Sequence, residues 1–418
     1  MLNELLLSSL RLGSRKDTLT GHDNTKTFFV KIQVAKHPGK RNSLKEEFEI
    51  LEHLNREGCQ TCPEVISFET ISKENLIELV KEEDREYIKS LEKDLFDVMI
   101  QKYVETFEEN YSLSDVLLSA IEQKMLGVYQ GDIKPDNIRF DSSKSICIFV
   151  DYDQALHLDD NQKNLSNDDF FDFCNRYDKE KYGFGNWLRH FPQFDERDYK
   201  LSLTNGLLDL SKTTILNKQI TTNSSSGIYH SINGPFVYAL GSRTLDDRSV
   251  VLNEIDFFEG EKVLDVGCNM GLLSTYLHKR GCNVTGIDND PRIVVLAKIV
   301  SNILSDKIDY EHIDLDEADS LNSFDTIFLF SVFHHTKNPI ENAKKITSSC
   351  NRIIIETRLI ENGKQPINGV WTPTTRWSLE TKEQLAVFLE KLFEGFRFAR
   401  NIGEVDKGRY IIELVKDV

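Results

Sequence analysis

Long apolar runs, regularly spaced cysteines and an excess of basic residues are all missing from this 418-residue sequence. No apolar run reaches the roughly 18 to 20 residues of a membrane-spanning helix, so we expect no transmembrane segment. The N-terminal stretch carries Glu4 and lacks a cleavage-type ending, so we expect no signal peptide. Seven scattered cysteines fit a reducing compartment, which predicts a cytoplasmic protein.

A net charge of −17 argues against a nucleic-acid partner, because such partners require a clustered basic face. Cys59 and Cys62 form a Cys-x-x-Cys pair with no second ligand pair downstream, so a zinc or redox role is the less favoured interpretation. Hydrophobic content of 39% and charged content of 28% are typical of a globular chain. The length predicts two or three domains.

The richest pattern lies in the second half of the chain. An apolar run that begins at Lys262 ends at Asp265 and opens into a glycine-containing turn. Leu272–Arg280 is predicted to form a helix, and Asn283–Ile287 a second strand that ends at Asp288. Strand, tight loop, helix, strand and acid make half of a doubly wound nucleotide-binding sheet. Asp288 lies about 20 residues after the loop, as expected for a carboxylate that binds ribose hydroxyls.

The loop itself indicates the class of cofactor. Its pattern is Asp-x-Gly-x-x-x-Gly, with Gly267 and Gly271, and it lacks the third glycine of a dinucleotide fingerprint. Asp265 would repel a pyrophosphate, whereas it suits the cationic sulfonium and amino groups of S-adenosylmethionine (SAM). These residues resemble motif I of the class I methyltransferases. A Rossmann-like domain that binds another nucleotide is the alternative.

The resemblance covers roughly Leu245–Val418. His312-Ile-Asp314 looks like the end of the family's third strand, and Phe324–Thr336 like its fourth strand and the loop over the methyl group. The residues that the resemblance assigns to SAM binding are Asp265, Gly267, Cys268, Gly271, Asp288, Asn289 and Asp314.

The methyl acceptor is less constrained. An alcohol acceptor needs a base, and His334 or His335, on the loop after the fourth strand, could serve; histidines there more often only shape the loop. An anionic acceptor needs cations instead, and Arg358 and Arg376 are candidates because guanidinium groups match phosphate oxygens. Surface salt bridging is the commoner role of a single arginine.

In the first half, Thr27–Ile32 and Val98–Val104 are predicted strands, and Leu113–Met125 is a predicted helix. Ser43 is a predicted N-cap for a helix over Leu44–Leu54, with Glu46 at the capping-box position.

A second chemical motif follows these elements. Phosphoryl transfer from ATP needs an acid that orients the attacking hydroxyl, oxygen ligands for Mg²⁺ and a cation on the phosphates. Asp132-x-x-x-x-Asn137 supplies an acid and an amide, and Asp151 ends the next strand. The segment resembles the catalytic and metal-binding loops of the protein-kinase-like superfamily.

That resemblance implies a role for each of several residues. Asp132 would be the base, Lys134 would contact the γ-phosphate, and Asn137 and Asp151 would bind Mg²⁺. Lys31 and Glu47 would pair to hold the α- and β-phosphates, although Glu46 and Glu49 are rivals of Glu47. Lys102 and Val104 are also assigned to ATP binding.

The match also has departures. Gly131 replaces the arginine of regulated protein kinases, and Asp153 replaces the glycine after the metal-binding aspartate. No clean glycine-rich loop precedes Lys31, and no activation segment ends in Ala-Pro-Glu. The Gly-Asp form is closer to the aminoglycoside and lipopolysaccharide-sugar kinases, over roughly Leu10–Leu201. A pseudokinase that binds nucleotide without turnover is the alternative.

We therefore predict an N-terminal α+β bilobal protein-kinase-like domain over 1–205 and a linker with a helical lead-in over 206–244. A class I SAM-dependent methyltransferase domain, an α/β Rossmann-like domain with a doubly wound, mostly parallel sheet, is predicted over 245–418. The Thr-, Ser- and Asn-rich stretch 211–227 is the best linker candidate, and 229–256 is predicted to be helical.

A kinase and a methyltransferase on one chain resemble the bifunctional enzymes that cap O-antigen polymannose, in which the domain order is reversed. That resemblance implies phosphorylation of a sugar hydroxyl at a glycan end or precursor, followed by methylation of that phosphate, with peripheral association at the inner face of the membrane. Two alternatives remain: a small-metabolite or antibiotic kinase joined to an independent O-methyltransferase, and a pseudokinase-regulated methyltransferase.

Overall fold

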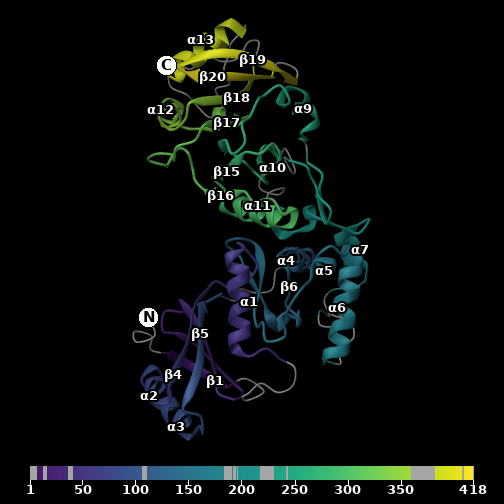
Figure 1. The fold of residues 1–418 in the computed structure, drawn as a ribbon, viewed down its shortest axis with the longest axis vertical. Coiled ribbons are helices and arrows are strands. Elements are labelled where there is room, and N and C mark those ends of the chain that lie inside the picture. Colours follow the sequence, from purple (N-terminus) through teal and green to yellow (C-terminus); the bar gives the residue numbers. More distant parts are fainter. Residues whose placement is uncertain are drawn as a thin grey trace. The chain divides into compact units, whose positions relative to one another are not determined.

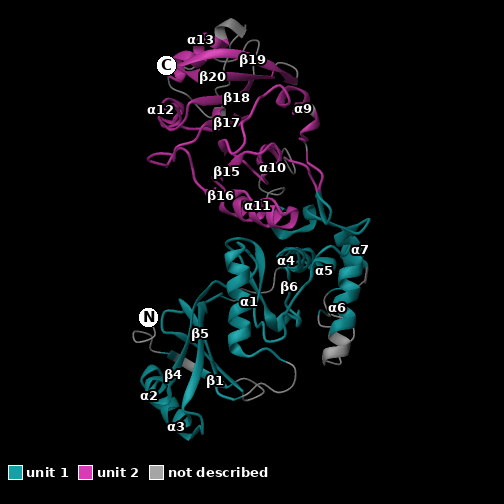
Figure 2. Ribbon diagram, viewed as in Figure 1, with its two compact units in different colours: residues 1–218, 234–238 teal, residues 219–233, 239–418 magenta. Residues whose placement is uncertain are grey.

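A computed structural model shows a chain of two compact units (Figures 1 and 2). Unit 1 comprises residues 1–218 and 234–238, and unit 2 comprises residues 219–233 and 239–418. The residues that the structure describes are 7–12, 17–35, 41–105, 111–182, 191, 194, 196–216, 230–241, 243–358, 382–406 and 409–417. Within these ranges, none of the helices is both long and apolar enough to cross a membrane.

Unit 1 begins with an antiparallel five-stranded sheet in the order β1-β2-β3-β5-β4. Its strands are β1 (Leu7–Leu12), β2 (Thr18–Asp23), β3 (Phe28–Gln33), β4 (Val65–Ser72) and β5 (Leu95–Lys102). Val30 and Ile32 on β3 pack into an apolar core together with Val98 and Ile100 on β5. Because side chains alternate across a strand, Lys31 lies on the opposite face of the sheet from this core.

Helix α1 (Leu44–Arg56) starts where the sequence predicts. Ser43 caps it, and Glu46 completes the capping box with the backbone of Ser43. Its buried residues include Glu47 together with Ile50, Leu51 and Leu54. Helices α2 (Lys73–Leu79) and α3 (Glu82–Ser90), which the sequence did not predict, lie between β4 and β5 along the chain.

The rest of unit 1 is built around helix α4 (Leu113–Met125), which is buried along most of its length. The hairpin β7 (Ile138–Asp141) and β8 (Ile146–Phe149) leads directly to Asp151. The remaining elements of this part are β6 (Val128–Tyr129), η2 (Pro135–Asn137), β9 (Leu156–His157), α5 (Asp160–Lys163), α6 (Asn167–Tyr182), α7 (Glu196–Ser202), β10 (Leu203–Thr204), β11 (Leu207–Asp209) and η4 (Leu210–Lys212).

Unit 2 contains a mixed seven-stranded sheet in the order β16-β15-β14-β17-β18-β20-β19. Strands β14 to β18 pair in parallel, whereas β20 is antiparallel to β18 and to β19. The strands are β14 (Lys262–Val266), β15 (Asn283–Asp288), β16 (Asp309–His312), β17 (Thr326–Phe330), β18 (Arg352–Arg358), β19 (Phe396–Asp406) and β20 (Arg409–Lys416). The order reverses at β14, and ligands bind beyond the carboxyl ends of strands at such a switch point.

Helices cover both faces of this sheet, as alternating strand residues require. Ile327 and Leu329 of β17 belong to one core cluster, whereas Phe328 between them belongs to the other. The first cluster includes residues of α12 (Pro339–Ser349) and α13 (Lys382–Leu392). The second includes residues of α9 (Asp246–Leu252) and α10 (Leu272–Lys279). Helix α11 (Pro291–Leu304) joins β15 to β16.

The lead-in predicted to be helical over 229–256 is helical only in part. Its described residues form two short strands, β12 (Ile232–Asn233) and β13 (Val237–Ala239), before α9 begins. Gly234 and Pro235 stand between the strands, and such residues favour a turn over a continuing helix. Residues 217–227 of the best linker candidate, 211–227, lie outside the described residues.

Candidate active sites

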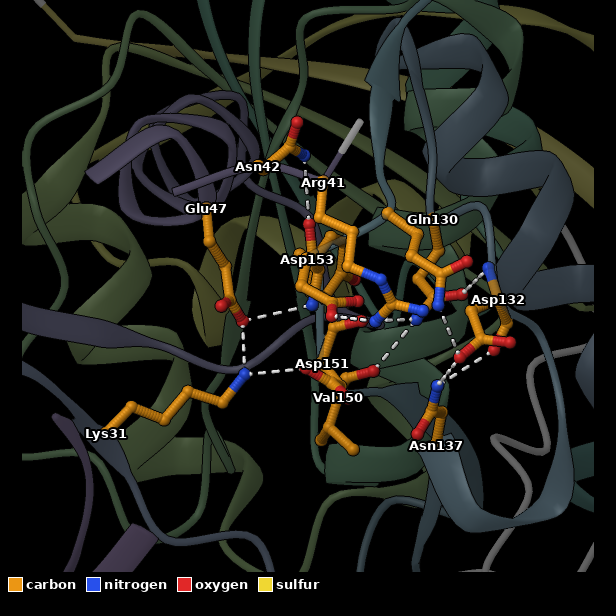
Figure 3. Close-up of polar contacts among 12 residues, drawn as sticks. Lys31, Arg41, Asn42, Glu47, Gln130, Asp132, Asn137, Val150, Asp151 and Asp153 are labelled. Atoms are coloured by element: carbon orange, nitrogen blue, oxygen red, sulfur yellow. Dashed lines mark hydrogen bonds and ion pairs between the residues drawn. The ribbon is translucent and has the colours of Figure 1, made fainter. Parts of the chain in front are cut away.

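In unit 1, the side chain of Lys31 joins two acidic residues that are distant in sequence (Figure 3). Its Nζ atom lies 2.6 Å from Oε1 of Glu47 on α1 and 2.8 Å from Oδ1 of Asp151. Burial alone would lower the pKa of Lys31, but the charges of Asp151 and Glu47 outweigh it and raise that pKa. The ammonium group is therefore charged at neutral pH.

The rival glutamates have other partners. Glu46 caps α1 through Ser43, and Glu49 lies 3.8 Å from Lys45 on the exposed face of the helix. Among the three, Glu47 is the one that the structure places against Lys31.

The loop after β6 brings the predicted catalytic residues together. Oδ2 of Asp132 accepts hydrogen bonds from Nζ of Lys134 at 2.5 Å and from Nδ2 of Asn137 at 3.0 Å. Asn137 also donates to the backbone carbonyl of Asp132 at 2.9 Å. A buried acid, an amine and an amide thus share one small region.

Asp151 follows β8 with a φ of 64°, a left-handed conformation that non-glycine residues rarely adopt. Backbone conformations of this kind cluster at active sites and ligand-binding sites. Burial alone would raise the pKa of Asp151, but the charge of Lys31 outweighs it and lowers that pKa. The carboxylate therefore remains ionised and able to bind a cation.

A cavity of about 670 Å³ in unit 1 is lined by most of these side chains, but not by Asp132, which is hydrogen-bonded to the lining residues Lys134 and Asn137. Lys31, Asn137 and Asp151 line it together with Val104, one of the two further residues predicted to bind ATP. Lys102, the other, does not line this cavity, and its amine pairs with Glu64. Asn137 and Asp151 carry side-chain oxygens of the kind that Mg²⁺ prefers, so they could hold this ion together with phosphate oxygens and water. Within the described residues, no cluster of three or more His, Cys, Asp or Glu side chains forms a separate metal site.

Cys59 and Cys62 are both buried in unit 1. Burial, followed by the contact with Cys62, raises the pKa of the Cys59 thiol well above its ordinary value. A protonated thiol is a poor nucleophile and a poor metal ligand, so this pair fits a packing role.

In unit 2, the glycine loop folds as the sequence predicts. The amides of Gly267 and Cys268 both donate to the carbonyl of Ile287 on β15, at 2.8 and 3.0 Å. Gly267 and Gly271 have φ values of 71° and 84°. A Cβ on Gly267 would lie 2.6 Å from Val332, and one on Gly271 would lie 2.1 Å from the hydroxyl of Tyr310. Only glycine fits at either position.

Two acids flank this loop. Asp265 is buried at the end of β14 and accepts a hydrogen bond from Oγ of Ser274 at 2.6 Å. Burial is the main cause that raises its pKa to about 6. Asp288 accepts hydrogen bonds from the amides of Asn269 and Asp290, at 3.1 and 3.0 Å. A cationic ligand and a pair of ribose hydroxyls would each stabilise one of these carboxylates.

The other predicted SAM residues lie beside the loop. Asn289 is exposed after Asp288, and its carbonyl lies 3.2 Å from Nε2 of His312. Asp314 is half-buried after β16, which pairs with β15. The side chain of Cys268 packs in a small core with Tyr310, so it shapes the loop from behind.

Comparisons with known proteins agree with this geometry. Residues 243–392 match the sequence profile of a methyltransferase domain family. The C-terminal region is a class I SAM-dependent methyltransferase domain.

Curated relatives match parts of the chain. The mitochondrial ubiquinone biosynthesis O-methyltransferase of Schizosaccharomyces pombe is 28% identical over 106 residues, which are 25% of this chain and 39% of that protein. The ubiquinone biosynthesis O-methyltransferase of Dechloromonas aromatica is 35% identical over 97 residues, 23% of this chain and 40% of that protein. The tRNA U34 carboxymethyltransferase of Shewanella halifaxensis is 26% identical over 222 residues, 48% of this chain and 65% of that protein. The chain thus spans less than two thirds of the length of each.

The predicted acceptor residues of the methyltransferase domain are only partly described. His334 and His335 lie in η5 (Phe333–His335), just after β17, and the side chain of His335 is exposed. Arg358 is the last residue of β18, where its backbone pairs with Arg409; its side chain is outside the described part. Arg376 lies outside the described residues altogether.

Asp316 holds the loop that follows these histidines. Its carboxylate accepts hydrogen bonds from the amides of Lys337 and Asn338, both at 2.9 Å, and from Nδ2 of Asn342 at 2.8 Å. It therefore ties the chain after β16 to the start of α12.

Sequence reasoning missed a charged cluster at the carboxyl edge of the methyltransferase sheet. Glu356 on β18 is fully buried and forms a bidentate pair with Arg248 of α9, at 2.6 and 3.1 Å. Arg409 lies 2.8 Å from the same carboxylate, and Ser331, directly after β17, donates to it. The available signal was a glutamate directly after the apolar run Ile353–Ile355, since a buried charge requires a partner.

Proposed function

We propose that this protein is a bifunctional enzyme. Unit 1 transfers a phosphoryl group from ATP to a sugar hydroxyl of a glycan end or precursor, and the methyltransferase domain then methylates the product. The observation that carries the proposal is the convergence of Lys31, Asn137 and Asp151 on one cavity, with Asp132 hydrogen-bonded to Asn137, in a chain that also has a methyltransferase domain.

In the phosphoryl-transfer step, Asp132 accepts the proton of the attacking hydroxyl and orients its oxygen. Lys31 neutralises phosphate charge, while Glu47 keeps the lysine extended toward the cavity. Asn137 and Asp151 would hold Mg²⁺, which neutralises the charge on the transferring group. The Nζ atom of Lys134 lies 2.5 Å from Oδ2 of Asp132, and in this scheme it would contact the γ-phosphate.

In the methyl-transfer step, the glycine loop would hold SAM, with Asp265 near its cationic groups and Asp288 on its ribose. When bound, SAM supplies an activated methyl group. The chain's own residues mainly position the acceptor and exclude water, because the displacement at the methyl group is in line. A phosphate acceptor needs no base, whereas a hydroxyl acceptor would use His334 or His335.

We favour the phosphate as methyl acceptor, with Arg358 and Arg376 as its proposed ligands. In this scheme one site makes the anion that the other consumes. The enzyme would work in the cytoplasm, in peripheral contact with the inner face of the membrane where glycan precursors are made.

The alternatives lead to different acceptors. Two relatives are O-methyltransferases of ubiquinone biosynthesis, which supports a small hydroxyl compound and two independent reactions. Another acts on tRNA by its name, but the net charge of −17 disfavours a nucleic-acid acceptor here. In a third scheme, unit 1 binds nucleotide and only regulates the methyltransferase domain.

The test uses surface glycan extract from the source organism, with Mg-ATP and SAM added singly and together. Release of S-adenosylhomocysteine and the mass of the acceptor are measured for the wild type and for Asp132→Ala. We expect methyl transfer only when ATP is present and Asp132 is intact. Methyl transfer without ATP would exclude the coupled scheme, and Mg-ATP binding without ADP release would favour the regulatory one.

A further inference from the structure

The short segment after Asp151 is held from one side by residues that precede α1 (Figure 3). Nη1 of Arg41 lies 2.5 Å from Oδ2 of Asp153, and both side chains are largely buried. The amide of Asn42 donates to the carbonyl of Asp153 at 2.8 Å. The side chain of Asn42 donates to the carbonyls of Tyr152 and Ala155, at 3.1 and 2.7 Å.

Helix α1 adds a further contact to the same segment. Oε1 of Glu47, which faces Lys31, also accepts a hydrogen bond from the amide of Tyr152 at 3.0 Å. The helix that carries Glu47 and the peptide that follows Asp151 are therefore fixed to each other by both side-chain and backbone contacts.

On its other side, the segment touches the proposed base. Nε2 of Gln154 donates to Oδ2 of Asp132 at 3.0 Å. Gly131 makes this approach possible, because a Cβ at that position would lie 2.1 Å from the carbonyl oxygen of Gln154. The absence of an arginine before Asp132 thus has a steric cause in this fold.

Gln130 joins the same two loops a second time. Its Nε2 donates to the carbonyls of Val150 and Asp151, at 2.9 and 2.7 Å, and its Oε1 accepts from the amide of Asp132 at 2.7 Å (Figure 3). The loop of the base and the loop of the metal-binding aspartate are therefore fixed to each other by hydrogen bonds from two glutamines.

We propose that Gln154 is a positioning residue for Asp132, and that Arg41, Asn42 and Asp153 hold the peptide that carries it. This inference rests on the phosphoryl transfer proposed for unit 1 and deepens it. Contacts within the described part of unit 1 thus hold the base and the peptide after Asp151 together. A carboxylate of Asp132 that is already oriented before substrate binds lowers the free energy needed to orient the hydroxyl in the transition state.

The test is steady-state ADP release from Mg-ATP by the full chain, with the glycan extract as acceptor. Gln154→Ala should lower kcat about tenfold while KM for ATP stays within about twofold, because the amide acts on the base and not on the nucleotide. The side chain of Gln154→Glu has nearly the same shape, but once ionised it cannot donate a hydrogen bond to Asp132. Its kcat should therefore fall at least as much as that of Gln154→Ala.

Arg41→Ala should lower kcat as well, and Arg41→Lys should restore part of it. The matched control is Gln162→Ala, which removes an amide that only caps α5 through Asp159. Mg-ADP binding by calorimetry checks that every variant is folded. If the wild type is active and Gln154→Ala keeps its kcat, the positioning role is wrong while phosphoryl transfer stands. If the wild type releases no more ADP than Asp132→Ala, both proposals fall.

Discussion

Replacing Glu356 by glutamine removes the carboxylate that faces Arg248 and Arg409 inside unit 2. Burial alone would raise the pKa of Glu356, but the hydrogen bonds and charge of Arg248, with Ser331 and Arg409, lower it from 4.5 to about 2. A drop of that size corresponds to about 3 kcal/mol of folding free energy. We therefore expect Glu356→Gln to destabilise unit 2 by about 3 kcal/mol at pH 7, within the usual range for breaking a buried ion pair.

The stabilisation that Glu356 provides depends on pH. Because the pKa in the folded state lies below that in the unfolded chain, the stabilisation is complete above about pH 4.5 and is lost as the pH falls toward 2. The difference between wild type and Glu356→Gln should therefore shrink to less than half of its neutral value at about pH 3.

Denaturant unfolding of the full chain measures this difference. Addition of S-adenosylhomocysteine identifies the unfolding transition of unit 2. A ligand that binds the native state moves only the transition of the unit that binds it to higher denaturant concentration. The control is Glu341→Gln, which breaks an exposed pair with Lys344 and should cost less than about 0.5 kcal/mol. A loss for Glu356→Gln that is equally large at pH 7 and at pH 3 would refute the electrostatic account.

Two other substitutions give further predictions. Asp265→Asn should stabilise the ligand-free unit 2 by about 2 to 3 kcal/mol at pH 7, since burial raises this pKa from 3.8 to about 6 and the cost of ionisation is fully present above pH 6. Calorimetry should show weaker binding of SAM, and a less stable variant at pH 7 would contradict the reasoning. Gly131→Ala should lower the thermal midpoint of unit 1 and its ADP release, because the added Cβ meets a backbone oxygen at 2.1 Å. Gly58→Ala, with a φ of 77° and no atom within 4 Å of the added Cβ, should cost only about 1 kcal/mol; equal losses would exclude the steric cause.

Local sequence was sufficient wherever one element carries its own start and stop signals. The prediction of Leu113–Met125 is confirmed to the residue, and the capping box at Ser43 and Glu46 places the start of α1 correctly. The strand, glycine loop and helix around Gly267 also form as predicted, because the positive φ values there permit only glycine or a few polar residues. In each case the deciding interactions lie within a few residues along the chain.

Contacts between distant segments could not be predicted in this way. The partners of Glu356 are 108 and 53 residues away in Arg248 and Arg409, and no spacing rule connects them. Gln154 is 22 residues from Asp132 along the chain. The two come together because Gly131, which has no Cβ, lets the backbone of Gln154 approach closely. Sequence shows which polar residues are present, whereas tertiary packing decides which of them share a buried site.

The buried charged side chains at the two candidate sites have different partners. In unit 1, the ammonium of Lys31 faces two carboxylates, Glu47 and Asp151, so the described contacts leave an excess of negative charge where Mg²⁺ would bind. In unit 2, the carboxylate of Glu356 faces the guanidinium groups of Arg248 and Arg409, whereas Asp265 and Asp288 lie at the carboxyl ends of β14 and β15 in the same sheet. Charged side chains of both signs therefore lie at this edge, where each buried carboxylate is stabilised by its own partners: Arg248 and Arg409 for Glu356, and Ser274 for Asp265.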